Sequence, residues 1–253
     1  MKKTILTISI AIVSIAILLV GFFIIRGKTY KAQNPIATIE IEGYEKPIKI
    51  ELDPQSAPNT VANFIKLANS GFYNDYEMTI YENSLTATDG KEAYLSNIQE
   101  NPEKDYVYGV KGDFVRNDVK NYIRHEKGVI TMERDDYSYF GYTEEGYNSA
   151  NAKFSILTAD ESNLNGLAAA FGKVIEGTDV LDAIAATRVE ETDTEETTAT
   201  TEDSQDKTQN VIKIKSITVD TFGVDYGMPQ VFDIEDTRNK VNQIYQQYFG
   251  GYQ

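Results

Sequence analysis

The side chains that could do chemistry in this chain are few, and they gather between residues 124 and 147. The sequence has no cysteine and a single histidine, His125, which lies between Arg124 and Glu126. These counts exclude thiolate nucleophiles, disulfides, zinc–thiolate sites and multi-histidine metal centres. Two acidic pairs, Asp135-Asp136 and Glu144-Glu145, could bind a cation, but such pairs are more often simply solvated. We therefore expect no metal centre and no cofactor, and we interpret His125 as a structural residue.

A loop rich in aromatic residues follows this histidine. Between residues 135 and 147 it carries Tyr137, Tyr139, Phe140, Tyr142 and Tyr147. Aromatic side chains line the grooves that bind extended, proline-containing peptides. The same rings could instead cover an apolar flank of the fold. The sequence leaves both interpretations open.

The charge of the chain is strongly acidic, and it limits the possible partners. With 24 basic and 39 acidic residues the formal net charge is −15, so the chain should repel nucleic acid. Residues 190–206 carry eight acids and no base, mixed with threonine and serine. That composition is typical of a solvated, disordered insertion, which we place at 190–209.

The N-terminus has the pattern of a membrane anchor. Lys2 and Lys3 precede an almost unbroken apolar run over residues 5–25, and Arg26 and Lys28 follow it. At ~1.5 Å per residue this run would span about 31 Å, the thickness of a bilayer core. We expect an uncleaved signal anchor over 1–28, a tether over 29–34, and a single-pass protein of the cell membrane whose large domain lies outside the cytoplasm. A removed signal peptide is the alternative.

Alternation of apolar and charged residues predicts the strands that follow. Ile48, Ile50 and Leu52 alternate with Lys49 and Glu51, so every second side chain can enter a core. Residues 36–41 have the same period, and the two strands are close enough in sequence to form a hairpin. Further strands are predicted at 77–81, 128–132, 153–157, 169–174 and 211–219. The pattern is less clear from residue 76 to residue 108.

Two helices are predicted inside this domain and one after it. Apolar residues recur at helical spacing from 61 to 68, after Pro58 at the first helical position and Ser56 or Ala57 as the N-cap. Gly71 is suited to end that helix in a left-handed conformation. A second helix is expected over 179–186, with Thr178 as its N-cap. A tail helix over 233–249, within a C-terminal segment 227–253, is amphipathic; it could pack on its own domain or bind a partner.

The order of these elements resembles the cyclophilin family of peptidyl-prolyl isomerases, from about residue 35 to residue 222. The resemblance implies a mainly β fold over 35–226, a closed antiparallel barrel capped by two helices. The segments that carry it are Ala57-Pro58-Asn59-Thr60-Val61, Gly71-Phe72-Tyr73, Arg124-His125-Glu126-Lys127-Gly128-Val129-Ile130-Thr131-Met132, Asn148-Ser149-Ala150-Asn151-Ala152-Lys153-Phe154, Leu164-Asn165-Gly166 and Phe171-Gly172-Lys173-Val174-Ile175-Glu176-Gly177.

Rotation about an X–Pro bond requires crossing a barrier of ~18–20 kcal/mol that amide resonance sets. A dry apolar pocket for the proline ring and a donor aimed at the prolyl nitrogen lower it. In cyclophilins an arginine is that donor, and the resemblance places its position at Ile80. The pocket phenylalanine then corresponds to Leu85, and a groove glutamine to Thr88.

Other positions of the family's site also differ in this chain. The Gln-Phe-Phe segment reads Lys153-Phe154-Ser155, and a histidine position reads Ala168, whereas Leu164 is retained. The Ala-Asn pair reads Glu133-Arg134. By resemblance, the residues expected to line the substrate groove are Ile80, Leu85, Thr88, Arg134, Lys153, Phe154, Ser155, Leu164 and Ala168.

Two functions follow from this pattern. The domain could be a weak isomerase that assists the folding of exported proteins, with Arg134 or Arg124 in place of the missing donor. It could instead be a catalytically inactive domain that binds extended or proline-containing segments, as a chaperone or scaffold. In both cases the expected partners are polypeptides with X–Pro segments, and the sequence does not decide the oligomeric state.

Overall fold

The computed structural model describes residues 33–189 and 210–249. The expected signal anchor, most of the tether and the acidic insertion lie outside the described residues. Within the described ranges, none of the helices has the length and apolar character needed to cross a bilayer. The fold described below is that of residues 34–249, which form one compact unit.

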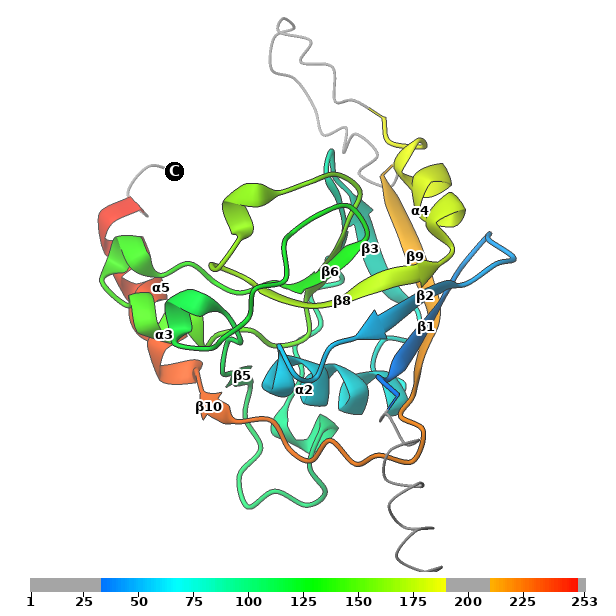
Figure 1. Cartoon of the computed structure of the whole chain (residues 1–253). Helices are drawn as coiled ribbons and strands as arrows, with labels where there is room; N and C mark the ends of the chain where they lie inside the picture. The colour runs from blue at the N-terminus through cyan, green and yellow to red at the C-terminus, as the bar shows by residue number, and fades with distance from the viewer. Residues whose placement is uncertain (1–32, 190–209, 250–253) are drawn as a thin grey trace, which may run out of the picture. The chain divides into compact units, whose positions relative to one another are not determined.

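Eight antiparallel strands close into a barrel (Figure 1). Around the barrel the order is β1-β2-β8-β6-β7-β4-β3-β9, so the first and last strands pair and close it. The strands are β1 (Ile36–Ile41), β2 (Ile48–Leu52), β3 (Tyr76–Ile80), β4 (Ser84–Ala87), β6 (Val129–Met132), β7 (Phe154–Leu157), β8 (Ala169–Glu176) and β9 (Val211–Asp220). The predicted closed barrel is confirmed. The barrel strand that the sequence analysis missed, β4, lies in the stretch where the pattern was less clear, and two short strands outside the barrel, Tyr108–Val110 and Val231–Asp233, were also not predicted.

Period-two alternation accounts for the direction of the side chains in the first strands. Ile48, Ile50 and Leu52 are fully buried, and so are Ala37 and Ile39 on the paired strand. Because successive side chains of a strand point to opposite faces, these residues fill the barrel while their charged neighbours face outward. The barrel interior is therefore one continuous apolar core.

Helices α2 (Pro58–Asn69) and α4 (Thr178–Ala185) both add side chains to that core. Pro58 begins α2 as predicted, and Ala57 is the N-cap residue, but no side chain of the cap accepts a hydrogen bond. A backbone N–H of the first turn finds its acceptor outside the helix, because the buried carboxylate of Asp113 accepts a hydrogen bond from the Thr60 N–H at 2.7 Å. Burial raises the pKa of Asp113, although its hydrogen bonds from Asn59 and Thr60 oppose that shift.

The sequence prediction for the start of α4 was wrong by one residue. Thr178 is the first helical residue, and the N-cap is Gly177 in the left-handed region at φ +85°. A Cβ at this position would lie 2.5 Å from the carbonyl oxygen of Pro47, so the close approach of two chain segments favours glycine here. At the end of α2, Gly71 has φ +78°, as the sequence indicated.

A small layer outside the barrel carries the C-terminal part of the chain. Strand β5 (Tyr108–Val110) pairs with β10 (Val231–Asp233), and α5 (Glu235–Phe249) follows β10 directly. The tail helix is therefore confirmed, and it packs on its own domain through the buried side chains of Ile234 and Val241. Tyr245 and Tyr248 lie on its exposed part, so its apolar face is shorter than predicted. The aromatic loop also contains a short helix, α3 (Thr143–Tyr147), which the sequence analysis did not predict.

Candidate functional site

A cavity of about 280 Å³ lies beside the end of β4, the segment that follows β6 and the segment that precedes β7. It brings together residues that the sequence places far apart. Three of the residues expected at a substrate groove, Thr88, Arg134 and Lys153, line it together with Thr86 and Glu133.

Two residues that line this cavity, Thr86 and Glu133, belong to a ladder of polar side chains joined by hydrogen bonds. The hydroxyl of Ser155, which is almost fully buried and does not line the cavity, donates to Glu133 Oε1 at 2.5 Å and lies 2.7 Å from Thr86 Oγ1. Thr86 in turn lies 2.9 Å from the hydroxyl of Ser84. Buried polar groups of this kind are stable because each has a partner. Through Thr86 and Glu133 this polar ladder gives the cavity a hydroxyl and a carboxylate.

Three other expected groove residues belong to the barrel core. Ile80 is 3% exposed, and Leu85 and Phe154 are fully buried. All three are part of the continuous apolar core and do not line the cavity. Leu164 and Ala168 are half-buried in the turn that precedes β8, and neither lines a cavity described here. The resemblance placed Ile80, Leu85 and Phe154 at the groove, whereas the structure places their side chains in the core.

Arg134 is held at one side of the cavity in a fixed orientation. Its guanidinium lies 5.4 Å from the ring centre of Phe114 and 5.1 Å from that of Tyr147. Its Nε donates to the Leu167 carbonyl at 3.3 Å and one Nη donates to the Asp135 carbonyl at 3.1 Å. Aromatic stacking and main-chain acceptors together restrict this side chain without neutralising its charge.

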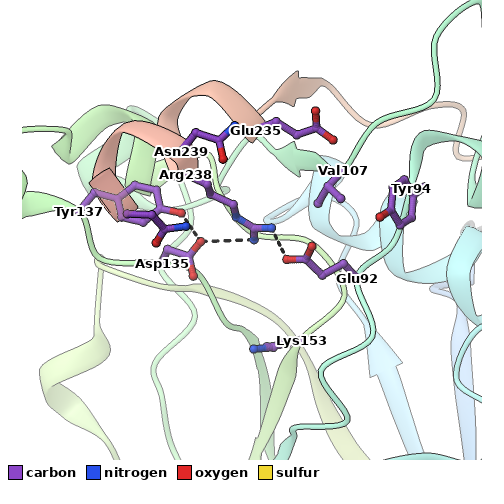
Figure 2. Close-up of a pocket in the computed structure, with 10 residues that line it drawn as sticks. Glu92, Tyr94, Val107, Asp135, Tyr137, Lys153, Glu235, Arg238 and Asn239 are labelled. Carbon is purple, nitrogen blue, oxygen red and sulfur yellow. Dashed lines mark hydrogen bonds and ion pairs between the residues drawn. The ribbon is translucent and has the colours of Figure 1, made fainter. Parts of the chain in front are cut away.

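A second cavity, of about 610 Å³, lies between the barrel and α5 (Figure 2). Figure 2 shows Arg238 reaching from α5 to a point between Asp135 and Glu92. Its Nη2 is 3.4 Å from Asp135 Oδ2, and its Nη1 forms an ion pair with Glu92. The hydroxyl of Tyr137 donates to the same oxygen of Asp135 at 2.5 Å.

This network fixes the protonation states of its members. Burial is the main cause that raises the pKa of Tyr137 to about 12, and the hydrogen bond to Asp135 adds to it. The phenol therefore keeps its proton at neutral pH. Burial lowers the pKa of Arg238, but the oxygen of Tyr137 and the charges of Asp135 and Glu92 outweigh it and raise the pKa. Arg238 is therefore a permanent cation at the edge of the cleft.

The sequence analysis did not identify Arg238. Its spacing did contain a signal, because Arg238 is four residues after Ile234 and three before Val241. Residues at these intervals share one face of a helix. An arginine on the apolar face of the tail helix could therefore have been expected to face the domain.

The remaining candidates have structural or surface positions. His125 is buried; its Nε2 lies 3.0 Å from Thr131 Oγ1 and its Nδ1 lies 3.3 Å from Asn165 Oδ1. Burial lowers the pKa of His125, while the bond to Asn165 opposes this shift, and the ring has the surroundings of a neutral, structural histidine. Arg124 is exposed and lines neither cavity.

The aromatic loop is divided between several environments. Tyr137 is buried and lines the second cavity, and Tyr147 stacks on Arg134. Tyr139 is 79% exposed. The loop therefore supports the cleft with two of its rings and presents another to solvent.

Comparison with known proteins agrees with this architecture. Peptidyl-prolyl cis-trans isomerase A of Dickeya dadantii is 32% identical over 149 residues, which cover 56% of this chain and 68% of that protein. Peptidyl-prolyl cis-trans isomerase B of Bacillus subtilis is 30% identical over 131 residues, which cover 51% of this chain and 77% of that protein.

Solved structures show the same fold. A cyclophilin-type isomerase of Cryptosporidium parvum superimposes with a TM-score of 0.52 at 17% identity, over 73% of this chain and 96% of the other. The Mimivirus cyclophilin gives a TM-score of 0.51 at 17% identity, over 75% and 90%. The model of the family described as cyclophilin type peptidyl-prolyl cis-trans isomerase matches residues 36–219. With the closed eight-stranded barrel, that match establishes that the chain belongs to the cyclophilin-type peptidyl-prolyl isomerase family.

Proposed function

We propose that this chain binds X–Pro segments of exported polypeptides in the cleft lined by Thr86, Thr88, Glu133, Arg134 and Lys153, and that it isomerises them only slowly. The observation that carries the proposal is the burial of Ile80 in the barrel core, at the position where the family resemblance places the catalytic arginine. An isoleucine cannot donate to a prolyl nitrogen. The main source of transition-state stabilisation in such a site is therefore missing from this position.

The polar side chains of Thr86 and Glu133, which line the cleft, support the same conclusion. A proline ring gains binding free energy mainly by leaving water for an apolar pocket. Here it would meet the hydroxyl of Thr86 and the carboxylate of Glu133, both of which already bond to Ser155. Main-chain groups of an extended peptide suit such a surface better than an isolated ring does.

Arg134 is the donor we propose for the remaining activity. It lines the cleft, and stacking on Phe114 and Tyr147 holds its guanidinium in place. A preorganised charge needs little rearrangement as the amide twists, so it can still lower the barrier. A catalytically inactive peptide-binding domain remains the second candidate, and the polar ladder Ser84–Thr86–Ser155–Glu133 is the observation that favours it.

A kinetic assay separates these functions. The full chain, Arg134→Ala and the matched control Arg124→Ala would be compared on a proline tetrapeptide, with the rate of cis–trans exchange as the readout. We expect measurable but weak catalysis that Arg134→Ala abolishes and Arg124→Ala leaves unchanged. Exchange at the uncatalysed rate, together with peptide binding, would establish the inactive binding domain. Activity typical of efficient isomerases would contradict the proposal.

We also propose that the domain is anchored to the cell membrane and faces away from the cytoplasm. The apolar run over residues 5–25, with basic residues on both sides, supports this location. Protease treatment of intact cells tests it. We expect the domain to be degraded from outside while a cytoplasmic protein survives, and protection of the domain would refute the orientation.

A further inference from the structure

The two cavities are parts of one cleft. Four residues, Glu92, Asp135, Lys153 and Arg238, line both of them. The smaller part, where we place the X–Pro segment, lies beside the end of β4 and the segments that follow β6 and precede β7, and the larger part continues toward α5. Arg238 stands at the junction, with its ion pairs to Glu92 and Asp135 spanning the cleft (Figure 2).

This bridge joins three segments that lie far apart in the sequence. Glu92 precedes the 3-10 turn Leu95–Asn97, Asp135 follows β6, and Arg238 belongs to α5. The backbone that carries the arginine is held in place while α5 is docked, because Ile234, just before the helix, and Val241, within it, are both buried. Helix α5 lies beyond residues 36–219, which the family model matches, so the bridge is made with a part of the chain outside that match.

We propose that Arg238 is a specificity-determining residue that limits how far a bound peptide can extend along the cleft. The inference rests on the proposed function, since it requires an X–Pro segment in the smaller part. A short peptide needs only the smaller part, and the bridge borders that part at one end. A longer peptide must displace Arg238 from its two carboxylates before it can enter the part lined by α5.

The two ion pairs of Arg238 are strong enough to affect peptide binding and weak enough for a long peptide to break. Arg238 is 24% exposed and the two carboxylates are 42% exposed, so water competes for all three groups. Partly exposed ion pairs of this kind change equilibria by roughly two- to fivefold each. Breaking both should therefore tighten the binding of a long peptide by roughly four- to twenty-five-fold, and change the binding of a short one less.

Binding of two synthetic peptides tests the proposal on the full chain. One is an Ala-Pro tetrapeptide, and the other carries the same core with uncharged extensions at both ends. The protein contains no tryptophan, so a tryptophan placed on each peptide reports binding without background. The variants are Arg238→Ala and Glu92→Gln, and the control is Lys240→Ala, an exposed residue of the same helix.

We expect both bridge variants to bind the long peptide more tightly than the wild type, with a smaller change in affinity for the short peptide and no effect of Lys240→Ala. Glu92→Gln leaves α5 intact, so it distinguishes opening of the bridge from loss of the helix. Weaker or unchanged binding of the long peptide in both variants would overturn the inference and leave the proposed function standing. Binding of neither peptide to any of the proteins would overturn the proposed function and the inference with it.

Discussion

Replacing Ile80 with arginine distinguishes what the family resemblance implies from what the tertiary structure implies. By resemblance alone, Ile80→Arg would return the missing donor to the site and raise isomerase activity. In the structure Ile80 is the last residue of β3, pairs with Leu85 and has a side chain that is 3% exposed within the apolar core. We therefore expect Ile80→Arg to destabilise the barrel without restoring catalysis.

The magnitude follows from burial. The substitution removes a buried isoleucine, which contributes ~1.5–3 kcal/mol of transfer free energy. It also places a charge among apolar side chains, which costs several kcal/mol when the charge has no partner. A loss of at least about 4 kcal/mol is expected, a large fraction of the ~5–15 kcal/mol that stabilises a typical domain.

Urea denaturation followed by circular dichroism measures this loss, and the tetrapeptide assay measures activity. Ile80→Val is the matched control, because deletion of one buried methylene costs only ~0.5–1.5 kcal/mol. An Ile80→Arg protein that keeps the stability of the wild type and gains isomerase activity would refute the reasoning. It would mean that this side chain faces the cleft and that the register of β3 differs from the one described.

Three further predictions concern residues that support the site. Asn151 is buried and donates to the Tyr108 carbonyl at 2.6 Å, so Asn151→Ala should lower the free energy of unfolding in urea by about 2–4 kcal/mol through unpaired main-chain groups. Gly177→Ala should lower the melting temperature, with a cost above about 1 kcal/mol, because its left-handed φ and the nearby Pro47 carbonyl leave no room for a Cβ. The pKa of His125 is lowered in the fold, so the unfolded chain binds more protons below about pH 6.5 and stability falls there. Melting curves of wild type and His125→Gln between neutral and mildly acidic pH should show the smaller acid loss in the variant, and equal losses would contradict a buried neutral ring.

Periodicity was sufficient to predict most of the barrel. The alternation at Ile48, Ile50 and Leu52 identified a strand with one buried face, and Pro58 and Gly71 marked the ends of the first helix. These signals are local, because side-chain direction in a strand and the dihedral limits of proline and glycine depend on neighbouring residues alone. The family resemblance rests on the same scaffold segments.

The composition of the cleft depended on contacts between distant segments. Counting along the chain placed Ile80 at the catalytic position, but only the pairing of β3 in the closed barrel decides that its side chain enters the core. Arg238 reaches Asp135 across 103 positions of sequence and Glu92 across 146. No local sequence pattern predicts these contacts of Arg238, since they require β10 to pair with β5 and α5 to pack on the domain. The sequence by itself thus determined the family and the anchor-like N-terminus as expectations, whereas tertiary packing decided which charges share the cleft.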